Sequence, residues 1–298
     1  MLNKKYRIDN YKVIGNMFYK QRKIDKAIEF YNKSYNSPNG KRDIELILDL
    51  ALIYDEIGNH NLAEEKYREI LELNPKDERA YYGIAIIYDN LENYKEAIKY
   101  YNKAIELNPK YNRAYFFLAG AYDLEGEKEK AIKCYNKVLE MNDKDFWTYN
   151  NLGTIYEELG QYELALRMFD RSLEIEPYHY KALFNKGVAL GKLGKVKESI
   201  EHYKLSIEEN PSFAFSYLNL AVTYKESKEY EKAIQVLSKG ISNNPESEFL
   251  YYNRACCYVY ISKFNEALED LEKAINLYPG FQKYIEEDDE LAPLKSYL

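Results

Sequence analysis

The chain has 298 residues, of which 46% are hydrophobic and 31% are charged, and this composition is typical of folded, soluble proteins. Its formal net charge of −7 argues against nucleic acid as the main partner, because phosphate binding needs a basic surface. No segment approaches the roughly 20 apolar residues that span a bilayer, and the start of the chain lacks the apolar run of a secretory signal. We therefore expect no membrane partner either.

The cysteines point to a reducing compartment. There are 3 of them, Cys134 and the adjacent pair Cys256 and Cys257, and none has the CxxC spacing of a redox or zinc site. An odd number without such spacing indicates free thiols in a cytoplasmic protein. We expect all three to be small core residues.

Prolines mark a regular period along the chain. Pro75 and Pro109 lie 34 residues apart, Asp143 holds the next position, and the same step then gives Pro177, Pro211, Pro245 and Pro279. Each follows a run with helical apolar spacing, which a proline ends because it lacks the N–H that a helix needs. Between two prolines, as in "YYGIAIIYDNLENYKEAIKYYNKAIELNP", two helical runs flank a break at "NLENY". The period therefore predicts repeated pairs of helices.

The repeated unit resembles the tetratricopeptide repeat, a helix–turn–helix motif of about 34 residues. In residues 78–111 the motif positions hold Tyr81, Ile84, Ala85, Tyr88, Ala97, Tyr101 and Pro109. In residues 146–179 they hold Tyr149, Leu152, Gly153, Tyr156, Ala165, Phe169 and Pro177. The resemblance implies an all-α, right-handed superhelical solenoid.

The same register divides the chain. It predicts an N-terminal extension (1–7), a C-terminal capping segment (282–298) and eight repeats between them: 8–41, 44–77, 78–111, 112–145, 146–179, 180–213, 214–247 and 248–281. Small residues at the eighth place of a repeat, such as Gly153 and Gly187, should let its two helices approach closely. We expect the large aromatic residues to fill the space between neighbouring repeats.

No pattern in the sequence indicates catalysis. His60, His179 and His202 fall at unrelated places in their repeats, so nothing pairs them into a metal site or a base–nucleophile arrangement. The Gly-rich stretch "GVALGKLGKVKES" lacks the spacing of a phosphate-binding loop. We expect a protein that is not an enzyme and that needs no cofactor or metal.

The first helices of such repeats line the concave side of the superhelix, so their exposed places are candidate binding positions. The sixth place holds an asparagine in four successive repeats: Asn151, Asn185, Asn219 and Asn253. Asparagine is a poor helix former, but its amide can bond both the C=O and the N–H of an extended backbone. The row resembles the asparagine ladders of the O-linked N-acetylglucosamine transferase repeats and of the armadillo import receptors. The alternative is a row of solvated side chains that bind nothing.

Three further places complete the candidate peptide-binding surface. Aromatic residues at the fifth and second places are candidate anchor pockets, although some could serve only to pack neighbouring repeats: Tyr82, Phe116, Phe184 and Tyr252, then Trp147, Phe215 and Phe249. The second place also carries the cations Arg79, Arg113 and Lys181. The twelfth place is acidic in four repeats, with Asp55, Asp89, Asp123 and Glu157. Unless these carboxylates are merely solvated, that row favours a basic or amine-bearing segment.

A known device of the family is absent. Repeat domains that bind acidic C-termini use lysine, asparagine and arginine side chains from three repeats, and Lys12 and Asn16 match the first part of that set. Asp49 stands where a second asparagine is needed and Gly83 where an arginine is needed, so a bound carboxylate would be repelled.

We therefore expect a non-catalytic scaffold that binds an extended segment of a protein or peptide partner in its concave groove. One alternative is a self-associating protein that organises a larger complex, with the groove merely solvated. A second alternative, a receptor for a peptide signal, is weakened because the repeats and the cap leave no room for an output domain.

Overall fold

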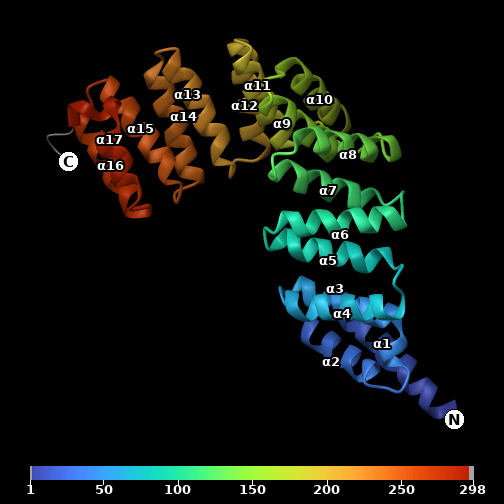
Figure 1. Cartoon of the computed structure of the whole chain (residues 1–298). Helices are drawn as coiled ribbons and strands as arrows, with labels where there is room; N and C mark the ends of the chain where they lie inside the picture. Colours follow the sequence, from blue (N-terminus) through green and yellow to red (C-terminus); the bar gives the residue numbers. More distant parts are fainter. Residues whose placement is uncertain (1, 295–298) are drawn as a thin grey trace. The chain divides into compact units, whose positions relative to one another are not determined.

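The computed structural model describes the backbone of residues 2–294 and the side chains of residues 10–285 and 287–294. Within that range the chain is helical and contains no strand (Figure 1). The helices fall into two compact units, of which unit 1 ends at Asp143 and unit 2 begins at Lys144. None of the described helices combines the length and the apolar character needed to cross a membrane.

Both units consist of successive antiparallel helix pairs. Unit 1 contains α1 (Leu2–Lys20), α2 (Ile24–Tyr35), η1 (Gly40–Arg42), α3 (Ile44–Glu56), α4 (His60–Leu73), α5 (Glu78–Asn90), α6 (Tyr94–Leu107), α7 (Asn112–Leu124) and α8 (Lys128–Met141). Unit 2 contains α9 (Phe146–Glu158), α10 (Tyr162–Ile175), α11 (Tyr180–Lys192), α12 (Val196–Glu209), α13 (Ala214–Glu226), α14 (Tyr230–Asn243), α15 (Glu248–Tyr260), α16 (Phe264–Leu277), α17 (Phe281–Glu287) and η2 (Asp289–Leu294). The all-α fold predicted from the sequence is confirmed.

The helix ends follow from local sequence. The second helix of a repeat ends two residues before the periodic proline, as α6 does at Leu107 and α10 does at Ile175. Several first helices begin after an aspartate that accepts a hydrogen bond from a free backbone N–H, a stabilising N-cap. Asp145, for example, accepts from the N–H of Thr148 at 2.9 Å.

The turn inside each repeat needs one residue in the left-handed region. The fifteenth place has positive φ in every repeat, with glycine in four of them and other residues in four: Gly58, Gly126, Gly160 and Gly194, then Arg22, Glu92, Lys228 and Ser262. Glycine adopts this conformation freely, whereas an L-residue does so at a cost. The four non-glycine turns are therefore strained.

The core lies between the two helices of each repeat. The alanine at the twentieth place and the ring at the twenty-fourth place are buried in most repeats, for example Ala165 and Phe169 at 0% exposure. A Cβ added to Gly153 would lie 2.4 Å from the Phe169 ring, and one added to Gly187 would lie 2.8 Å from Tyr203. The small eighth-place residues do allow close approach, but the group that approaches is an aromatic ring. At these places the large aromatics therefore fill space within a repeat, whereas we expected them to fill the space between neighbouring repeats.

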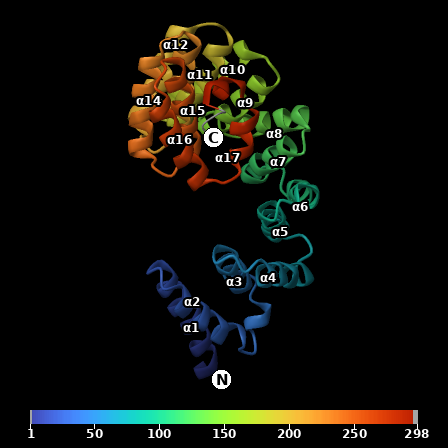
Figure 2. The ribbon, with the colours of Figure 1, turned by 90° about the vertical axis from the view of Figure 1, so that its left-hand side faces the viewer.

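The first helices of successive repeats contact one another directly, α9 with α11, α11 with α13, and α13 with α15. In Figure 2 the second helices α12 and α14 lie at the outer edge of unit 2, and α11 and α15 lie on its inner side. We call the surface that α9, α11, α13 and α15 form the first-helix face of unit 2. In unit 1 the corresponding face includes α3, α5 and α7.

The C-terminal segment folds onto the last repeats of unit 2. Ile285, Leu291 and Leu294 are buried in one cluster with residues of α15 and α16. Lys225 of α13 is paired with Glu290 at 2.8 Å, so the segment also reaches the first-helix face. Residues 295–298 of the predicted cap, and residue 1 of the predicted extension, lie outside the described part of the chain.

Candidate functional site

The asparagine row lies on the first-helix face of unit 2, with all four side chains partly exposed. The amides of Asn219 and Asn253 each donate to a carbonyl one turn earlier in their own helix, to Phe215 at 3.0 Å and to Phe249 at 2.8 Å. Neither bond joins two helices, so neither amide holds the fold together. Both amides can rearrange to meet a ligand at little cost.

The other half of the row is part of a side-chain network that sequence reasoning missed. The Asn185 amide donates to Oδ1 of Asn150 at 3.1 Å and to Oγ1 of Thr154 at 3.4 Å, which joins α11 to α9. Asn150, which is 5% exposed, donates in turn to Asn151 at 3.4 Å. The sequence signal for this network was the adjacent pair "NN" at 150–151. Its first member, Asn150, occupies the fifth place, where the other repeats carry an aromatic residue, a leucine or, in residues 8–41, Lys12.

Aromatic side chains lie near the N-terminal ends of three of these first helices, α9, α13 and α15. Trp147 and Phe215 are 43% and 50% exposed, and Phe215 stacks on Phe249 with ring centroids 5.3 Å apart. Lys181 lies with its Nζ 6.0 Å from the Trp147 ring, in cation–π range. The second-place residues of unit 2 thus form a strip of three rings and one cation, of which Phe249 is partly buried and the others are exposed.

His179 lies beneath this strip and was given no role by the sequence pattern. Its ring centroid is 4.5 Å from that of Trp147 and 5.0 Å from that of Phe146. The side chain is 7% exposed, and both ring nitrogens are buried without a hydrogen-bond partner among the described residues. Burial, assisted by the charge of Lys181, lowers the pKa of His179, so the ring is neutral at physiological pH.

The fifth-place aromatics have different surroundings. Phe184 packs edge-on against Phe213 with centroids 5.2 Å apart and also contacts Tyr203. Tyr252 contacts Phe281 and donates its hydroxyl to Asp288, so the chain's own C-terminal segment covers this predicted anchor. In unit 1, the centroid of the Tyr82 ring lies 4.9 Å from that of Tyr111, and the centroid of the Phe116 ring lies 5.7 Å from that of Tyr135.

Unit 1 has an apolar pocket of ≈ 420 Å³ on its own first-helix face. Its lining residues are Leu48, Leu52, Asp55, Tyr67, Arg79, Tyr82, Gly83, Ile86, Tyr111, Arg113 and Phe117. Arg79 is held by Asp77 and Glu45, each at 2.8 Å, whereas Arg113 is exposed and has no ion-pair partner among the described residues. The missing side chain at Gly83 leaves room for the Tyr67 ring, which a Cβ there would meet at 2.2 Å.

The acidic twelfth-place residues are not equivalent. Asp55 pairs with His60 at 3.1 Å, Asp89 accepts from the Tyr101 hydroxyl at 2.8 Å, and Asp123 pairs with Lys128 at 2.6 Å. Burial raises the pKa of Asp89, and the bond from Tyr101 opposes that shift. Each of these carboxylates thereby ties a first helix to the second helix of its own repeat.

Glu157 differs from these three, because no described group donates to its carboxylate or pairs with it. Burial raises its pKa above the usual value, an effect that Lys192 opposes and Glu158 reinforces. Glu157 lines a pocket of ≈ 150 Å³ on the first-helix face of unit 2, together with Thr154, Phe169, Phe184, Asn185 and Val188.

The residues that partly match a carboxylate clamp are occupied by internal contacts. Lys12 pairs with Asp43 at 3.0 Å, and Asn16 accepts a hydrogen bond from the Tyr31 hydroxyl. Both contacts hold the first repeats of unit 1 together.

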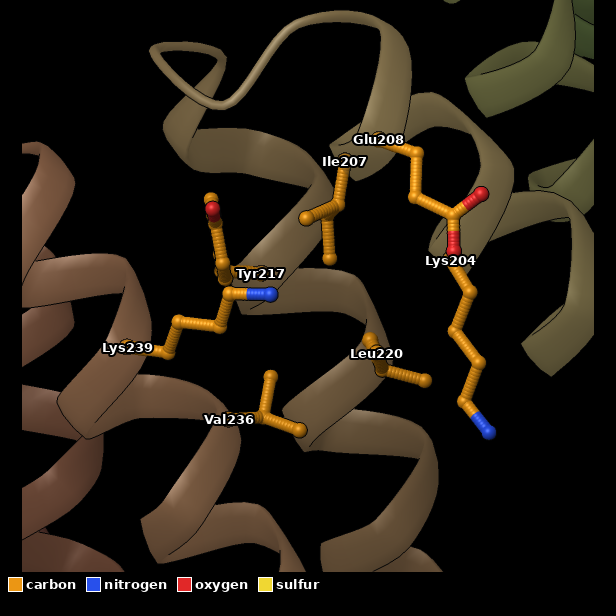
Figure 3. Close-up of a pocket in the computed structure, with 7 residues that line it drawn as sticks. All are labelled: Lys204, Ile207, Glu208, Tyr217, Leu220, Val236 and Lys239. Carbon is orange, nitrogen blue, oxygen red and sulfur yellow. The ribbon is translucent and has the colours of Figure 1, made fainter.

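A second pocket of unit 2 contains none of the four asparagines in its lining. The hollow has a volume of ≈ 260 Å³ and lies between α12, α13 and α14. Figure 3 shows the residues that line it, which are the apolar or aromatic Ile207, Tyr217, Leu220 and Val236 and the charged Lys204, Glu208 and Lys239. The twenty-third place holds Val236 here, whereas in α6 it holds Tyr100, whose ring covers Tyr81 with centroids 6.5 Å apart. A short side chain at this place therefore leaves the hollow open.

Potential metal ligands come together at the C-terminal segment. Cys256, Asp288 and Glu290 offer ligand atoms within 4.8 Å of one another. Glu290 is neutralised by Lys225, and Asp288 accepts from Tyr252, so these carboxylates already fasten the segment to α13 and α15. All three cysteines are free; Cys256 and Cys257 are buried and Cys134 is partly exposed, with burial raising the pKa of each thiol.

Comparisons with solved structures agree with this architecture. A tetratricopeptide repeat protein from Parabacteroides merdae is 22% identical and superposes with a TM-score of 0.65, covering 84% of this chain and 98% of its own. MamA is 30% identical (TM-score 0.51; 55% of this chain, 95% of MamA). YrrB, described as a tetratricopeptide repeat protein with an unusual peptide-binding site, is 26% identical (TM-score 0.51; 63% of this chain, 97% of YrrB). A sequence search of curated proteins found no match.

Models of the tetratricopeptide repeat match most of the chain. They cover residues 44–77, 78–111, 146–179, 180–213 and 249–281, and two further models of this repeat cover residues 121–160 and 202–235. Proteins built from these repeats are generally non-catalytic scaffolds for protein–protein interaction, and their domains typically bind protein partners. The helix pairs and these matches together show that the chain belongs to the tetratricopeptide repeat family.

Proposed function

We propose that the chain is a scaffold that binds an extended segment of a partner protein on the first-helix face of unit 2. The observation that carries the proposal is the state of Asn219 and Asn253, whose amides bond only to carbonyls of their own helices. Each costs about 0.5 kcal/mol or more relative to alanine in a helix interior, and neither holds two helices together. A peptide backbone supplies the partners that would offset this cost.

The surrounding surface suits such a segment. Trp147 and Phe215 expose large apolar rings beside the row, and exposed aromatic residues are the usual anchors of recognition surfaces. The amides would hold the backbone of the segment without regard to its sequence, while the rings would read its side chains. YrrB, with its reported peptide-binding site, provides a parallel within the same family.

The experiment compares two variants of the full chain by selection from a phage-displayed library of random linear peptides. N219A/N253A removes the two amides that only contact their own helices. N102A is the control, because Asn102 lies on the second helix α6 and its amide also donates to a carbonyl one turn earlier, that of Ile98 at 2.7 Å, besides the Tyr122 hydroxyl at 3.3 Å. Circular dichroism checks that both variants keep their helicity.

We expect the unmodified chain and N102A to enrich the same peptides with micromolar affinity, and N219A/N253A to bind them about tenfold to hundredfold more weakly, since two hydrogen bonds are lost. Equal binding by all three proteins would overturn the role of the row. Light scattering across a range of concentrations tests the alternative of self-association, because a chain that remains monomeric cannot use this face to assemble copies of itself.

A further inference from the structure

The pocket at Glu157 has the chemistry of a site for a positively charged side chain. It lies between α9, α10 and α11, beside the asparagine row, and has a volume of ≈ 150 Å³. Phe169, Phe184 and Val188 supply apolar walls, and Glu157 supplies a carboxylate. This combination suits a methylene chain that ends in a cation.

Two places of the repeat explain why the Glu157 carboxylate is unpaired. In α6 the twenty-fourth place is Tyr101, whose hydroxyl donates to Asp89. In α10 the same place is Phe169, which has no hydroxyl. The seventeenth place, which supplies His60 to Asp55 and Lys128 to Asp123, is a tyrosine in this repeat and gives Glu157 nothing within bonding distance.

The remaining polar groups of the pocket are also acceptors. The Asn185 amide directs its N–H groups to Asn150 and Thr154, and no described group donates to its carbonyl oxygen. The Thr154 hydroxyl donates to the carbonyl of Asn150 at 3.2 Å. A ligand group here must therefore supply hydrogen-bond donors, and an ammonium or guanidinium group supplies several together with the complementary charge.

We propose that this pocket receives the lysine or arginine side chain of a segment bound to the first-helix face of unit 2. The inference rests on the proposed function and adds to it the chemistry of the partner. The cation would lie between the carboxylate of Glu157 and the carbonyl of Asn185. Its methylene groups would contact Phe184 and Val188, and the aromatic faces would add cation–π attraction.

The test repeats the peptide selection with E157Q and with E158Q. E157Q keeps the shape of the side chain and removes the charge from the pocket. Because no described group donates to the Glu157 carboxylate or forms an ion pair with it, the variant loses only a longer-range attraction to Lys192 and should retain its fold. E158Q removes one charge from the adjacent, exposed residue and controls for the net charge of the chain. One enriched peptide is then resynthesised with its basic residue replaced by norleucine, and all affinities are measured by fluorescence polarisation.

We expect peptides enriched by the unmodified chain and by E158Q to share a basic residue, and this preference to disappear in E157Q. E157Q and the norleucine replacement should each weaken binding about tenfold, and the two changes together should weaken it no further, as for two halves of one interaction. The inference would be overturned, and the proposed function left standing, by any of three results. These are enriched peptides that share no basic residue, a basic preference that survives in E157Q, and a basic preference that is lost in E158Q. If the unmodified chain enriches no peptide, the proposed function and the inference both fail.

Discussion

The contrast between Tyr101 and Phe169 gives a reciprocal test of what holds a repeat together. Tyr101 is 0% exposed and donates to the Asp89 carboxylate at 2.8 Å, while Phe169 is equally buried beneath Glu157 and donates nothing. Y101F removes a hydrogen bond to a charged group and leaves a half-buried carboxylate without its donor. F169Y adds a hydroxyl that can donate to the Glu157 carboxylate, which has no donor in the unmodified chain.

The magnitudes follow from the burial of the carboxylates. A hydrogen bond to a charged group contributes about 1.5–3 kcal/mol, so Y101F should destabilise the chain by that amount. F169Y should stabilise it by less, about 0.5–1.5 kcal/mol, because water already solvates part of the Glu157 carboxylate. Removal of the Tyr101 bond should also raise the pKa of Asp89 further, since that bond is what opposes the effect of burial.

Urea unfolding followed by circular dichroism provides the assay, with D89N and the double variant Y101F/D89N completing a thermodynamic cycle. The coupling between Tyr101 and Asp89 should account for most of the loss in Y101F. A coupling near zero would refute the reasoning, and so would destabilisation by F169Y. The same F169Y variant should bind basic peptides more weakly, because the added hydroxyl competes for Glu157.

Three further predictions concern single residues. K228G should stabilise the chain by about 0.5–1 kcal/mol, because the turn there has a φ of 60°, whereas G160A should destabilise it by a similar amount; paired urea melts test both. V236M should raise the free energy of unfolding by about 0.5–1 kcal/mol, because the longer side chain partly fills the hollow of ≈ 260 Å³. Thermal melts would show the gain, and an unchanged melting temperature would mean that the hollow is more favourably filled by water than by a methionine side chain. The pKa of His179 is lowered in the folded chain, so the unfolded chain takes up the proton first as the pH falls. The free energy of unfolding should be unaffected by this group above the unfolded pKa of about 6.5 and should decrease as the pH drops toward the folded value. H179F should be more stable at low pH and its stability should depend less on pH, with the remaining dependence due to His202, whose pKa is also lowered.

The periodic features of the fold were predictable from the sequence. Proline spacing located the helix ends, because a proline acts on its own helix and needs no knowledge of the rest of the chain. The position of the asparagines within each repeat likewise predicted that they would share one helix face. These inferences depend only on local geometry that every repeat shares.

The features that distinguish one repeat from another were harder to predict. The link between Asn185 and Asn150, and the pairing of Lys225 with Glu290, depend on side-chain directions and on contacts across as many as 65 residues. The unpaired state of Glu157 could have been found by comparing the twenty-fourth places, where phenylalanine replaces tyrosine. The sequence alone did not show that this tyrosine can donate to the twelfth-place carboxylate, as Tyr101 does to Asp89.

That substitution has a consequence for how a chain of near-identical units becomes specific. Copies of one unit begin with the same contacts, so a new recognition feature requires that one copy differ without ceasing to fit its neighbours. Phe169 meets both conditions, because its ring fills the same buried position as that of Tyr101 and lacks only an oxygen atom. A repeat can therefore gain a surface group that is able to bind a ligand when an internal hydrogen-bond donor is lost. The carboxylate that the donor would have paired with then remains available to solvent.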